Sequence, residues 1–111
     1  MANESERRRY HRFTVSAILI VPTIPDSPLE AEDICAGGFK ARFSEQPELG
    51  ILHETLLLLP GATFRNCLAR AVWVQEIGTP PPVWTAGFVL LMEIRQREPL
   101  LRALEKLAAR S

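Results

Sequence analysis

Hydrophobic and polar residues alternate along much of the chain with a period of two, which is typical of β-strands. The first alternating segment, residues 13–21, places apolar side chains on one face, namely Phe13, Val15, Ala17, Leu19 and Val21. The segments that continue this extended pattern are residues 29–35, 39–43, 51–59, 64–77 and 83–94. Their content of β-branched and aromatic residues also favours strands. We therefore expect six short strands.

Turn-forming residues separate the predicted strands. Ala36-Gly37-Gly38 lies between the segments 29–35 and 39–43, and this arrangement predicts a hairpin. Three consecutive prolines lie within the later turn at residues 78–82. Short strands joined at short intervals by such turns indicate a small antiparallel barrel.

The end of the chain changes to a helical period. Leu100, Leu104 and Leu107 recur at helical spacing, and Pro99 suits a first helical turn. We expect an amphipathic helix over residues 98–110 whose apolar stripe packs on the barrel; a partner-docking face is the alternative. The predicted fold is all-β with a terminal helix: a small six-stranded antiparallel β-barrel over residues 13–94, preceded by an Arg-rich, flexible arm at residues 1–12. Together they form a single domain, residues 1–111.

Composition narrows the function. The formal net charge is +0, so the molecule as a whole does not attract nucleic acid. No apolar run is long enough to span a bilayer, and the polar N-terminus is unlike a signal peptide, so we expect no membrane insertion and a cytoplasmic location. We expect Cys35 and Cys67 to be free, small, partly buried side chains. Neither His11 nor His53 has a recognisable catalytic or metal-ligating partner nearby in sequence, so we expect no enzyme, no metal and no cofactor.

Two segments offer binding chemistry. Arg8, Arg9 and Arg12 concentrate guanidinium groups, which bind phosphate oxygens bidentately and stack on flat bases. The segment from Asp33 to Gly38 sets a carboxylate, which can accept from the N–H groups of a guanine edge, beside glycines that permit close approach. Together they suggest a guanine nucleotide, although a solvated tail and a plain hairpin turn would leave the same pattern.

The chain resembles the PilZ family, whose members carry an RxxxR motif on an N-terminal arm and a [D/N]xSxxG motif in the barrel. Arg8 and Arg12 match the first motif, with Arg9 as a frequent additional arginine, and Asp33 and Gly38 match the second. The segments 70–74 and 86–90 resemble later strands of the family.

The resemblance implies a receptor for cyclic di-GMP that signals to an unidentified protein effector, in processes such as motility or biofilm formation. It assigns phosphates and guanine faces to Arg8 and Arg12, a guanine edge to Asp33, and the turn to Gly38 with Gly37. The arm would be mobile in the free protein and would wrap over the ligand.

One position departs from the family pattern. Cys35 stands where the family has serine, and a thiol is a weak hydrogen-bond donor. Loss of one neutral hydrogen bond costs about 0.5–1.5 kcal/mol, so we expect weaker binding rather than none. We also expect position 35, next to the turn, to be partly exposed.

Two other functions are compatible with the sequence. One is a divergent PilZ-like module that contacts proteins but no nucleotide, which Cys35 favours. The other is a barrel that stacks single-stranded nucleic acid on Trp73, Trp84 and Phe88. The zero net charge and the apolar surroundings of these aromatic residues instead favour a place in the core.

Overall fold

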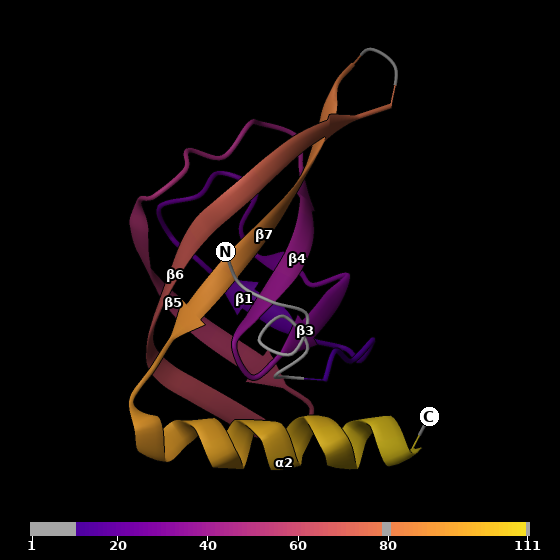
Figure 1. The fold of residues 1–111 in the computed structure, drawn as a ribbon, viewed down its shortest axis with the longest axis vertical. Helices are drawn as coiled ribbons and strands as arrows, with labels where there is room; N and C mark the ends of the chain where they lie inside the picture. The colour runs from indigo at the N-terminus through magenta and orange to yellow at the C-terminus, as the bar shows by residue number, and fades with distance from the viewer. Residues whose placement is uncertain (1–10, 79–80, 111) are drawn as a thin grey trace, which may run out of the picture.

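Residues 11–78 and 81–110, the part of the chain that this computed structural model describes, form seven β-strands in one antiparallel sheet and one helix (Figure 1). The elements are β1 (Ile18–Ile20), β2 (Leu29–Glu30), β3 (Asp33–Cys35), β4 (Gly38–Phe43), β5 (Leu52–Leu59), β6 (Ala62–Ile77), β7 (Val83–Leu91) and α2 (Ile94–Arg110). The spatial order is β2-β1-β5-β6-β7-β4-β3. The predicted combination of a small antiparallel barrel and a terminal helix is confirmed.

The two outer strands of this order are neighbours in sequence, so the sheet curls until its ends meet. Only Ala31 and Glu32 separate β2 from β3. Ala31 donates its backbone N–H to the carbonyl of Ala17, and Glu32 donates to the carbonyl of Lys40. The chain thus passes from the side of β1 to the side of β4 at this point. This transfer explains why the single strand predicted at residues 29–35 is two strands, and why the sheet has seven strands rather than six.

The alternating segment near the N-terminus covers the core as predicted. Phe13, Ala17, Leu19 and Val21 are buried, while Thr14 is exposed. Only β1 within this segment is a regular strand, but the alternation of buried and more exposed side chains already begins at residue 13. Within the barrel, the rings of Phe39 and Phe88 stack with centroids 5.0 Å apart.

The helix α2 lies across one end of the barrel (Figure 1). Leu100 and Leu104 are fully buried, which confirms that the apolar stripe packs on the barrel.

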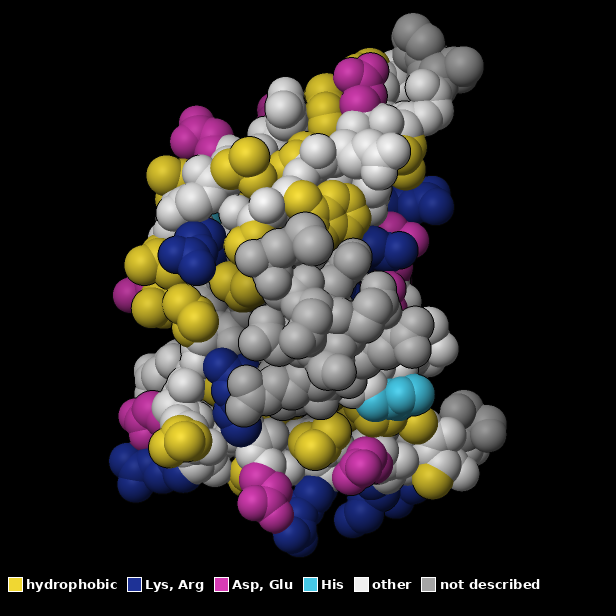
Figure 2. All heavy atoms as spheres, viewed as in Figure 1, with side chains coloured by type: hydrophobic (Ala, Val, Ile, Leu, Met, Phe, Trp, Pro, Cys, Tyr) yellow, Lys and Arg dark blue, Asp and Glu magenta, His cyan; other side chains and the backbone are white. Residues whose placement is uncertain are grey.

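The predicted start of the helix was wrong: α2 begins at Ile94 rather than at residue 98, and Pro99 lies inside the helix. Residues 95–98 are all polar or charged, so the first turn carries no apolar periodicity in the sequence. Ile94 itself is 89% exposed. Acidic and basic side chains alternate along this end of the surface (Figure 2). No helix in the described ranges is long and apolar enough to cross a membrane.

The hairpin of β6 and β7 extends beyond the other strands at the end away from α2 (Figure 1). The register between these strands shifts after Ala71, which pairs with Phe88, whereas Trp73 pairs with Gly87. The extra residue, Val72, forms a bulge, and both Val72 and Trp73 are exposed.

Candidate functional site

Asp33, Cys35 and Gly38 of the second motif lie on the hairpin of β3 and β4. Cys35 pairs with Gly38, which leaves Ala36 and Gly37 as a two-residue turn and confirms the predicted hairpin. Of the first motif, Arg8 and Arg9 lie outside the described residues, as does most of the predicted arm. Arg12 is described, and it directly precedes the residue that starts the buried alternation.

Arg12 and Asp33 are in direct contact. Phe13 exchanges two backbone hydrogen bonds with Ile34, of 2.8 and 2.9 Å, which places the neighbouring Arg12 beside β3. Nη1 of Arg12 donates to Oδ1 of Asp33 at 2.5 Å, and Nζ of Lys40 lies 3.7 Å from Oδ2. The side chain of Asp33 is 19% exposed, whereas that of Arg12 is 59% exposed. Arg12, the last residue of the first motif, thus contacts Asp33, the first residue of the second motif.

Cys35 is buried, with 7% of its surface exposed, so our expectation of a partly exposed position was wrong. The turn beside it is held against the barrel, because the backbone N–H of Leu90 donates to the carbonyl of Gly37 at 2.9 Å. Cys67, on β6, is also buried, and burial raises its pKa while the charge of Arg97 partly offsets the rise. Both thiols are free.

Gly38 allows β4 to pack closely against β7. A Cβ atom at this position would lie 2.1 Å from the carbonyl oxygen of Phe88, closer than any real contact. The backbone of Gly38 is not in the left-handed region, so the glycine is required by packing and not by the turn geometry that we had expected.

A row of outward-facing residues continues from Asp33 across the sheet. Asp33 pairs with Lys40, Lys40 with Gly87, and Gly87 with Trp73. A Cβ at Gly87 would meet Nε1 of Trp73 at 2.1 Å, so the indole lies across this glycine. Trp73 is 40% exposed, and its predicted place in the core was wrong. The bulge at Val72 changes the phase of the strand and turns the indole outward.

The neighbouring row adds a further cation. Arg70 is exposed and pairs with Val89, which in turn pairs with Gly38 beside the turn. The outer face next to the β3–β4 turn therefore carries cationic, carboxylate and aromatic side chains, and we call it the motif face; it comprises Arg12, Asp33, Lys40, Arg70 and Trp73. Cations bind phosphate oxygens and an exposed indole stacks with flat rings, so this face suits an anionic ligand with aromatic groups.

Sequence reasoning missed Lys40 and Arg70, and it named Trp73 only in the nucleic-acid alternative while favouring a place in the core. Lys40 could have been found by counting register outward from a two-residue turn. Arg70 and Trp73 become neighbours of this site only through pairings distant in sequence, and the bulge before Trp73 left no sequence signal.

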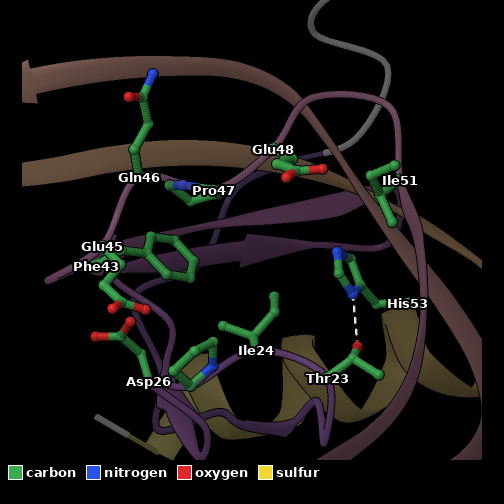
Figure 3. A pocket seen from close by; sticks show the side chains of 11 residues that line it. Thr23, Ile24, Asp26, Phe43, Glu45, Gln46, Pro47, Glu48, Ile51 and His53 are labelled. Carbon is green, nitrogen blue, oxygen red and sulfur yellow. Dashed lines mark hydrogen bonds between the residues drawn. The ribbon is translucent and has the colours of Figure 1, made fainter.

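A separate pocket of about 300 Å³ lies elsewhere, beside the loop after β1 (Figure 3). Its walls include Asp26, Glu45 and Glu48, and none of the predicted site residues lines it. Thr23 Oγ1 and His53 Nδ1 are hydrogen bonded there at 2.6 Å. Three carboxylates would repel a phosphate, so this pocket does not suit an anionic ligand. Within residues 11–78 and 81–110, no group of three or more His, Cys, Asp or Glu side chains could hold a metal ion.

No sequence profile of a known protein family matches the chain, and no curated protein matches it in sequence. A solved structure does match: the PilZ domain with c-di-GMP of YcgR from Escherichia coli. The two share 15% sequence identity, with a TM-score of 0.68 over 94% of this chain and 93% of the other. A structural match at this low sequence identity supports a shared fold and nothing more. The match covers nearly all of both chains. The chain therefore has the fold of a PilZ domain.

Proposed function

We propose that this chain binds cyclic di-GMP on the motif face and is a binding module rather than an enzyme. The observation that carries the proposal is the contact of Arg12 with Asp33 at 2.5 Å beside the β3–β4 turn, within a PilZ fold. These are the residues to which the two family motifs assign ligand contacts. The similar domain of YcgR carries c-di-GMP in its solved structure, which supports the same ligand here.

Each group on the face has a role in this proposal. Arg8, Arg9 and Arg12 bind phosphates and guanine faces, and Asp33 accepts from a guanine edge. Gly37 and Gly38 form the closely packed turn beneath the ligand. Binding exchanges partners: Arg12 moves from a carboxylate to a phosphate, and the carboxylate accepts guanine N–H groups instead. Arg12 and Asp33 each keep a polar partner, so this exchange leaves neither charge uncompensated.

Lys40 and Trp73 extend the proposed site across the sheet. Lys40 already neutralises Asp33 in part, at 3.7 Å, and would remain close to a bound phosphate. The exposed indole of Trp73 offers a flat surface at the far end of the same row. Stacking of a base on an aromatic side chain contributes about 1–3 kcal/mol.

Isothermal titration calorimetry with cyclic di-GMP tests the proposal. The wild type should bind, and Asp33→Ala should bind at least about tenfold more weakly, because a charged hydrogen bond to the guanine edge contributes about 1.5–3 kcal/mol. Glu98→Ala is the matched control, since Glu98 is an exposed acid of α2 that also pairs with an arginine. Cyclic di-AMP, which lacks the guanine edge, should bind poorly. Undetectable binding of cyclic di-GMP by the folded wild type would contradict the proposal.

The burial of Cys35 favours a second candidate function. A buried thiol in place of the family serine removes a good donor from the turn, as expected in a PilZ-type module that contacts proteins without nucleotide. The same titration separates the two functions. In the favoured one, the bound state is read by a protein effector in the cytoplasm, where the two thiols would stay reduced.

A further inference from the structure

Arg97, near the start of α2, joins three elements through one guanidinium group. Its Nη1 donates to the backbone carbonyl of Ala36 at 2.5 Å, and its Nη2 donates to the carbonyl of Leu90 at 3.2 Å. Ala36 lies in the β3–β4 turn and is 1% exposed, and Leu90 lies at the end of β7. Neither family motif includes Arg97.

These two carbonyls belong to the support of the motif face. Leu90 donates its own N–H to the carbonyl of Gly37, the residue after Ala36. The turn is therefore bonded to β7 directly and to α2 through Arg97. A guanidinium presents its donors in a rigid planar fork, so the turn cannot shift relative to α2 without breaking or bending these hydrogen bonds.

We propose that Arg97 is a positioning residue that couples occupancy of the motif face to the first turn of α2. This inference rests on the proposed function and adds its regulation. In the proposed function the ligand contacts Asp33 before the turn and lies over Gly37 and Gly38, so binding must fix the position of the Ala36 carbonyl. Because Arg97 is hydrogen bonded to that carbonyl, a change in the position of the carbonyl shifts or stiffens the first turn of α2.

The first turn of α2 is a surface that a partner could read. Ile94 is 89% exposed, and Arg95 is also exposed. A second link holds this turn from the other side, because Nε2 of Gln96 donates to the carbonyl of Arg65 on β6 at 3.1 Å. Side-chain hydrogen bonds thus connect the helix start to β6, to the end of β7 and to the candidate ligand turn, and a change at the turn alters their balance.

Amide NMR spectra recorded during titration with cyclic di-GMP test the coupling. In the wild type, the amides of residues 94–98 should shift along the same saturation curve as those of residues 35–38. In Arg97→Met, the turn amides should still shift, with about tenfold weaker affinity because the turn is less well positioned, while the α2 amides should stay in place. Arg97→Lys, which keeps the charge but loses the fork, should restore part of the α2 response.

Arg102→Met is the matched control, because Arg102 lies on the same helix, is 76% exposed and pairs with Glu98. It should behave as the wild type. Shifts of residues 94–98 in Arg97→Met as large as in the wild type would overturn the coupling and leave nucleotide binding intact. A wild type whose turn amides do not respond at all would overturn the proposed function and the coupling together. If Arg97→Met does not fold, Arg97→Lys decides alone, since the proposal requires its α2 shifts to be smaller than those of the wild type.

Discussion

Substitution of Arg12 by alanine should separate ligand affinity from stability. In the free protein Arg12 makes an ion pair with Asp33, but its side chain is 59% exposed and water screens the interaction. Exposed pairs contribute about 0.2–1 kcal/mol to the free energy of unfolding. For a domain of this size that amounts to a fall in melting temperature of less than about 8 °C.

The effect on binding should be larger. If Arg12 holds a phosphate of cyclic di-GMP, its loss removes a charged hydrogen bond worth about 1.5–3 kcal/mol. The dissociation constant should then rise roughly 10- to 150-fold. Asp33 also loses one of its two free-state partners, while Lys40 remains at 3.7 Å. The carboxylate is then easier for the ligand to engage, so the lower part of this range is expected.

Calorimetric titration and thermal unfolding of the same samples measure both quantities. Arg102→Ala is the control, because its ion pair with Glu98 has the same 2.5 Å separation on an exposed surface away from the turn. It should match Arg12→Ala in stability and the wild type in affinity. A melting temperature that falls by well over 8 °C with an unchanged dissociation constant would show that Arg12 serves the fold and not the ligand.

Three further predictions concern closely packed or buried positions. Gly38→Ala should lower the free energy of unfolding in urea by about 3 kcal/mol, because the backbone carbonyl of Phe88 must move. Gly87→Ala should cost less, because the atoms nearest to its added Cβ belong to the side chain of Trp73. Equal losses would be inconsistent with this reasoning. Cys35→Ser should lower the same quantity by about 1–3 kcal/mol at this buried position, and tighter nucleotide binding at unchanged stability would instead place the thiol against the ligand. Burial raises the pKa of Cys67 above its ordinary value of 9.0. As pH rises above 9.0 the unfolded chain therefore loses this proton first, and the free energy of unfolding falls. Cys67→Ala should lose less of this free energy over that pH range, and parallel pH profiles of the variant and the wild type would refute the assignment.

The inward face of the barrel was predictable because burial follows the phase of the alternation even where hydrogen bonding is irregular. Phe13 and Ala17 are buried although neither lies in a regular strand. The break between β2 and β3 was not predictable, because it arises where the chain changes neighbours and not from a local breaker residue. The helix start was missed because residues 95–98 are polar or charged and show no apolar periodicity.

The candidate site shows the same division between local and distant information. Asp33, Gly38 and the turn between them are local features, and the sequence located them correctly on the hairpin. Trp73 reaches the same face through β7, and a one-residue bulge reversed the side expected for it. Side chains that share a face through distant pairings need the register of every intervening strand, and one bulge is enough to change it.

The curling of the sheet until its ends meet also has a kinetic consequence. The hairpins of β3 with β4, β5 with β6, and β6 with β7 join neighbouring segments, so they can form early. The pairs that close the ring join distant segments: β1 pairs with β5, where Ile18 faces Leu58, and β4 pairs with β7, where Gly38 faces Val89. Such pairs must overcome loop-closure entropy and form late, typically in milliseconds to seconds. Since Gly38 and Val89 lie beside the β3–β4 turn, the motif face is assembled in the closing step, and a partly folded chain would lack the proposed binding face.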